Sequence, residues 1–144
     1  MANLTLKTSI EINAPAAKVW QALTDPTIVK QYFFGTHVKS DWKKGSTITW
    51  EGEWEGKSYK DTGTILDIDP GRMVKYDYWS SMSGTENMPE NYVDVTYELS
   101  ENNGKTTLII TQERIKSEES KNHSEQNWQW VFGKMKEMIE NGDV

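Results

Sequence analysis

Apolar and polar residues alternate at the start of the chain, from Leu4 to Ile12. Such alternation is typical of a strand with one buried face and one face in water. The Asn13-Ala14-Pro15 segment ends this strand, because proline fits the first turn of a helix. A first short helix is then predicted from a set of apolar residues on one helical face: Ala16, Val19, Trp20 and Leu23.

A second short helix is predicted from Pro26 to about Tyr32, with Asp25 as its N-cap and Gly35 as its end. From there the apolar period is two, which predicts strands at residues 36–39, 46–54, 57–69, 72–79, 92–99 and 105–113. Turns separate these strands, and residues 80–90 form a polar loop.

The last part of the chain changes to a helical period. A helix starting near Glu118 carries one apolar stripe, formed by Trp128, Val131, Phe132, Met135, Met138 and Ile139. That stripe needs a large partner, and the sheet is the only one that the pattern offers. The chain is therefore predicted to be a single α+β domain over residues 1–144. In it, a curved antiparallel sheet of about six or seven strands wraps around the long C-terminal helix, and two short helices lie between strands 1 and 2.

Composition narrows the function. The chain has 144 residues, no cysteine and a net charge of −6, which excludes disulfides and zinc–thiolate sites and argues against nucleic acid or an anionic membrane as partner. No signal peptide or membrane-spanning run is visible, so a cytoplasmic location is expected. Only 35% of the residues are hydrophobic, yet there are seven Trp, six Tyr and three Phe. The rings form either a plain core or the wall of a cavity.

No catalytic set emerges from the sequence. His37 and His123 are far apart, the glycines are scattered over turns, and the pairs Glu51/Glu53 and Asp67/Asp69 lie among polar neighbours. We therefore expect no metal and no cofactor, and interpret these groups as surface residues.

Four segments carry a resemblance to a known family: residues 10–24 with their Ala-Pro, Val-Trp and Leu-Thr pairs, residues 63–79, the strand pair 93–112, and the helix carrying Trp128, Phe132, Met135 and Ile139. They resemble the START-like helix-grip superfamily, also called SRPBCC, and within it the family related to the C-terminal domain of the activator of heat-shock-protein-90 ATPase. The resemblance implies a helix-grip fold and favours the cavity over a plain core.

The expected ligand is a hydrophobic or aromatic small molecule held between sheet and helix. The candidate binding residues are Phe34, Trp50, Trp54, Tyr59, Tyr76, Tyr78, Trp128, Phe132 and Met135. A slip of one residue in register would replace the two strand tyrosines by Lys75 and Trp79.

Two other functions stay open at this level: a co-chaperone-like regulator of a heat-shock ATPase, and a cyclase- or hydratase-like enzyme acting on polyketide-like substrates. An exposed apolar patch would favour the regulator. A buried carboxylate or histidine in the cavity would favour the enzyme.

Overall fold

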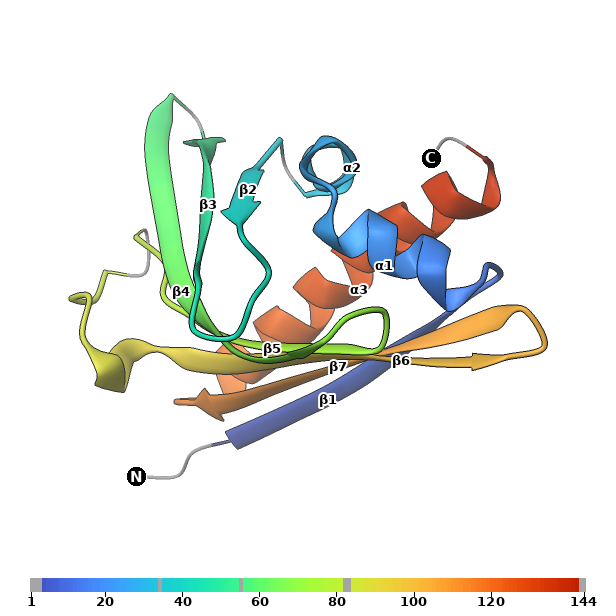
Figure 1. Cartoon of the computed structure of the whole chain (residues 1–144). Helices are drawn as coiled ribbons and strands as arrows, with labels where there is room; N and C mark the ends of the chain where they lie inside the picture. The colour runs from blue at the N-terminus through green and yellow to red at the C-terminus, as the bar shows by residue number, and fades with distance from the viewer. Residues whose placement is uncertain (1–3, 34, 55, 82–83, 143–144) are drawn as a thin grey trace.

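The computed structural model describes residues 4–33, 35–54, 56–81 and 84–142 (Figure 1). The strands in this part of the chain are β1 (Leu4–Ile12), β2 (His37–Ser40), β3 (Thr47–Trp54), β4 (Lys57–Asp69), β5 (Met73–Tyr78), β6 (Val93–Asn102) and β7 (Lys105–Ile115). The helices are α1 (Ala16–Thr24), α2 (Pro26–Tyr32) and α3 (Glu118–Glu140), with a short 3₁₀ helix, η1, at Pro89–Asn91.

The strands form one antiparallel sheet in the order β1-β7-β6-β5-β4-β3-β2. Figure 1 shows β2, β3 and β4 rising out of the plane of the other strands, so that the sheet curls around α3. All three α-helices lie on the same side of the sheet. The α+β helix-grip fold predicted from the sequence is therefore confirmed.

The apolar stripe of α3 is buried against the sheet. Val131, Phe132, Met135 and Ile139 are among the least exposed side chains of the chain, whereas Trp128 is partly buried at the edge of this core. Ser117 caps the helix by accepting a hydrogen bond from the Ser120 N–H at 3.1 Å, and two glutamates follow in the first turn. Trp128 lies in the N-terminal half of α3 and lines the pocket described below.

Strand ends differ from the prediction where turn geometry decides them. The β6–β7 hairpin is paired as far as Asn102 and Lys105, because Asn103 and Gly104 both have positive φ values, of 55° and 79°. Strand β5 ends at Tyr78, one residue before the predicted end at residue 79. Trp79 keeps only an isolated bridge to Thr62.

Candidate functional site

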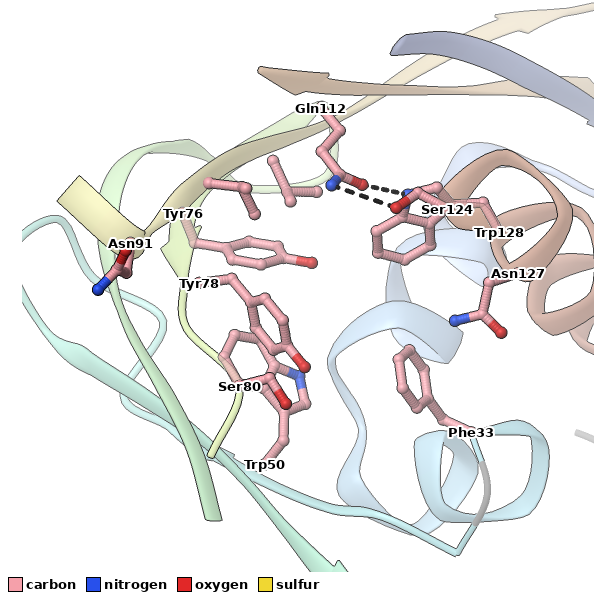
Figure 2. Close-up of a pocket in the computed structure, with 12 residues that line it drawn as sticks. Phe33, Trp50, Tyr76, Tyr78, Ser80, Asn91, Gln112, Ser124, Asn127 and Trp128 are labelled. Carbon is pink, nitrogen blue, oxygen red and sulfur yellow. Dashed lines mark hydrogen bonds between the residues drawn. The ribbon is translucent and has the colours of Figure 1, made fainter. Parts of the chain in front are cut away.

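A pocket of about 270 Å³ lies between the concave face of the sheet and the N-terminal half of α3 (Figure 2). Strands β3, β5, β6 and β7 provide one wall, and Ser124, Asn127 and Trp128 of α3 provide the other. Phe33, at the end of α2, and Asn91, in η1, border it as well. The space lies where the sheet curls around α3, so the pocket is a consequence of the fold.

Aromatic rings pack against one another along the sheet side of the pocket. The centroid of the Trp50 ring lies 5.0 Å from that of Tyr78, edge to face at 77°, and 5.2 Å from that of Tyr76, tilted at 49°. Alternation along β5 directs both tyrosines to the concave face, as the predicted register requires. On the helix side the Trp128 ring stacks on Phe132 at 5.5 Å and 5°. The wall is held by these ring contacts before any ligand enters.

The tyrosine hydroxyls are bound within the protein. The Tyr76 and Tyr97 hydroxyls share a hydrogen bond of 2.6 Å. Tyr78 donates its hydroxyl hydrogen to Oδ2 of Asp61, also at 2.6 Å. Burial raises the pKa of all three phenols well above their usual range, and for Tyr78 the Asp61 carboxylate raises the pKa further. Tyr76 and Tyr78 therefore contribute neutral rings to the pocket.

Asp61 on β4 pairs with Trp50 on β3, so the two side chains share the concave face of the sheet, and Asp61 is 7% exposed. Its Oδ1 accepts hydrogen bonds from the Ser81 backbone N–H at 2.9 Å and from the Ser81 hydroxyl at 3.2 Å. With the bond from Tyr78, the carboxylate has three donors. Such a set is the usual requirement for burying a carboxylate.

A second polar group joins sheet and helix. Gln112 on β7 is 8% exposed, and its Oε1 accepts a hydrogen bond of 2.9 Å from Nε1 of Trp128. Its Nε2 donates to the Ser124 hydroxyl at a longer 3.4 Å (Figure 2). The glutamine thus connects the two walls at one end of the pocket.

The predicted binding residues fall into three groups. Trp50, Tyr76, Tyr78 and Trp128 line the pocket. Phe132 and Met135 lie in the core, 1% and 0% exposed, because their positions on α3 face the sheet directly. The sequence predicted Phe132 in the cavity wall, but the structure does not place it there.

Of the other three predicted residues, the structure describes the side chain of Tyr59 alone. The Tyr59 hydroxyl bonds to that of Thr36 at 2.5 Å, in an open groove along β3 and β4. Phe34 lies outside the described residues, and so does the side chain of Trp54, whose backbone pairs with Lys57. Phe33, the neighbour of Phe34, borders the pocket.

Sequence reasoning missed the polar lining residues: Ser80, Asn91, Gln112, Ser124 and Asn127. Two of them carry a detectable signal. Gln112 continues the inward series of Leu108 and Ile110 on β7, and Ser124 lies one helical turn before Trp128 on the stripe of α3. Polar residues at core-facing positions therefore mark this pocket.

Charged groups are absent from the described pocket lining, which contains no histidine and no carboxylate. Both histidines are exposed, and no group of three metal-ligating side chains occurs among the described residues. Within the same residues, no helix has the length and apolar character to cross a membrane.

Comparisons with known proteins agree on family and fold. Residues 13–140 match the model of the family described as Activator of Hsp90 ATPase homolog 1-like protein. The structure of ChR145 from Cytophaga hutchinsonii is similar at 42% identity and a TM-score of 0.84, covering 96% of this chain and 95% of that one. No curated protein matches the chain.

More distant structures share the fold alone. The Aha1 dimer from Colwellia psychrerythraea has 19% identity and a TM-score of 0.74, covering 98% of this chain and 99% of that one. DynU16 of the dynemicin biosynthetic locus has 18% identity and a TM-score of 0.78, covering 96% of this chain and 48% of that one.

Proposed function

Since the chain belongs to the Activator of Hsp90 ATPase homolog 1-like family, with the helix-grip fold, we propose that it binds a hydrophobic or aromatic small molecule in the pocket between the sheet and α3. The observation that carries this proposal is the convergence of Trp50, Tyr76 and Tyr78 from the sheet with Trp128 from the helix around one space. Rings from both layers give a flat ligand a face to stack on at each side.

The size of the pocket limits the ligand. Known small-molecule pockets span roughly 300–1,000 Å³, so a space of about 270 Å³ suits a compact molecule of one or two rings. The neutral lining implies that binding comes from apolar burial. We expect an affinity that hardly changes with salt concentration and a negative heat-capacity change on binding.

Naphthalene is a suitable probe, because it has two flat rings and no polar group. Titrating it into ¹⁵N-labelled protein is expected to shift the amide resonances of residues on both β5 and α3. Shifts confined to one element, or no shift at all, would contradict the proposal.

A matched pair of variants locates the binding. Ser124→Phe places a ring in the pocket and is expected to abolish the shifts, whereas Glu125→Phe places the same ring on the adjacent, exposed helix position and is expected to leave them. Equal binding by the two variants would move the ligand out of this pocket.

The two alternatives have less support. Among the described residues the exposed large apolar side chains are Met88 and Trp130, and a Lys134 ammonium lies over the Trp130 ring. A docking surface for a heat-shock ATPase would need a contiguous apolar patch of several hundred Å². An enzyme would need an acid or base facing the ligand. The buried carboxylate near the described lining, Asp61, accepts three hydrogen bonds from Tyr78 and Ser81 and does not line the pocket.

A further inference from the structure

The side-chain amide of Gln112 has a fixed orientation. An indole N–H is only a donor, so the Gln112 atom that lies 2.9 Å from Nε1 of Trp128 is the carbonyl oxygen. The amide nitrogen consequently faces the other way, toward Ser124 and the pocket (Figure 2). The contact with Trp128 thus determines that Gln112 offers the pocket a donor.

This donor is only partly used. The amide nitrogen carries two hydrogens, and its one bond in the described part of the chain is the long contact to Ser124 at 3.4 Å. Gln112 is 8% exposed, so its amide meets solvent mainly through the pocket. A ligand that fills the pocket and displaces this solvent leaves the donor without a partner unless the ligand itself carries an acceptor, and an unpaired buried donor is unfavourable.

The surroundings select the kind of acceptor. No lysine, arginine or histidine lies among the described lining residues, so a ligand carboxylate would lose its hydration without gaining a counter-charge. No lining carboxylate is present to balance an ammonium group either. A carbonyl oxygen suits the site, because it accepts a hydrogen bond and carries no net charge.

We infer that the ligand is a neutral, flat molecule of one or two rings whose carbonyl oxygen accepts a hydrogen bond from Nε2 of Gln112. This inference rests on the proposed function. It adds the chemical class of the ligand and identifies Gln112 as the residue that selects it.

Two probes test the inference on the unmodified protein. 1-Tetralone and tetralin share one two-ring carbon frame, and only 1-tetralone has a carbonyl. Calorimetric titration is expected to give 1-tetralone an affinity about 3- to 10-fold higher, which is the usual effect of one hydrogen bond. In ¹⁵N spectra the side-chain amide resonances of Gln112 are expected to shift with 1-tetralone and to stay in place with tetralin.

Variants separate the donor from its neighbours. Gln112→Met keeps the length of the side chain but removes the amide, and the preference for 1-tetralone is expected to disappear. Ser124→Ala removes the competing acceptor and is expected to keep or increase the preference. If Gln112→Met fails to fold, the side-chain resonances of the unmodified protein still decide the question.

The outcomes distinguish the two proposals. Equal binding of both probes with unmoved Gln112 side-chain resonances would overturn the inference and leave the proposed function standing. A preference for 1-tetralone that persists in Gln112→Met would also overturn it. If neither probe binds, the proposed function is contradicted, and the inference fails with it.

Discussion

Gly63 on β4 permits a close approach to the backbone of β5, next to the pocket residue Tyr78. A Cβ atom added at this position would lie 1.8 Å from the carbonyl oxygen of Asp77 on β5 and 2.8 Å from its carbonyl carbon. Both are backbone atoms, so no side-chain rotation relieves the overlap. Gly63→Ala would therefore force the two strands apart by more than about 1 Å.

The flanking hydrogen bonds give the magnitude. Thr62 and Trp79 exchange backbone bonds of 3.1 and 2.9 Å, and the Thr64 N–H donates to Oδ1 of Asp77 at 2.6 Å. Weakening three such bonds, at about 1 kcal/mol each, together with the strain of overpacking, predicts a loss of about 2–4 kcal/mol in the free energy of unfolding. Tyr78 follows Asp77 directly, so binding of naphthalene is expected to weaken too.

Gly133 on α3 provides the control. A Cβ added there meets no atom within 4 Å. Because alanine favours a helix over glycine, Gly133→Ala is expected to raise the free energy of unfolding by about 0.5–1 kcal/mol.

Urea denaturation followed by circular dichroism measures both variants. With a slope of roughly 1–3 kcal/mol per molar urea, Gly63→Ala is expected to lower the midpoint by about 0.7–4 M, and Gly133→Ala to raise it slightly. An unchanged midpoint for Gly63→Ala, or shifts of the same sign for the two variants, would refute the argument from close strand contact.

Three further predictions concern the core and the titrating groups. Met135→Asp places a charge at a fully buried position and is expected to lower the free energy of unfolding by several kcal/mol. Gln126→Asp, on the exposed side of α3, is expected to change the free energy of unfolding little. Equal melting temperatures of the two variants would contradict the assignment of the buried stripe. Burial raises the pKa of Asp77, so the folded state holds this proton more tightly than the unfolded state, and stability falls as the pH rises from the usual carboxyl range through the raised pKa. Asp77→Asn is expected to remove that part of the slope in unfolding free energy against pH, and identical slopes would count against it. Burial also raises the pKa of four phenols, those of Tyr32, Tyr76, Tyr78 and Tyr97. Ultraviolet titration is therefore expected to show these four phenols protonated until the protein unfolds, and their ionisation in the folded protein would contradict this.

The sequence by itself determined the elements and most of their order. Several patterns can be recognised without the fold, because each extends over a few residues only. They are the alternation from Leu4 to Ile12, the prolines at the starts of α1 and α2, and the helical period from Trp128 onward. The same local rules placed Tyr76 and Tyr78 on one face of β5. Together with the resemblance in four segments, they were enough to predict the helix-grip arrangement.

The composition of the pocket was decided by tertiary structure. Whether a ring lines the pocket or packs in the core depends on the distance between the sheet and α3 at that ring. Trp128 lines the pocket, whereas Phe132, one helical turn later, is buried in the core. The spacing of β4 and β5 depends on contacts such as that of Gly63 with Asp77, which no local pattern indicates. The amide of Gln112 receives its direction only because β7 brings it to Trp128, sixteen residues further along the chain. A hydrogen bond between distant segments has no periodic signature, so its direction becomes defined only when the sheet closes on the helix.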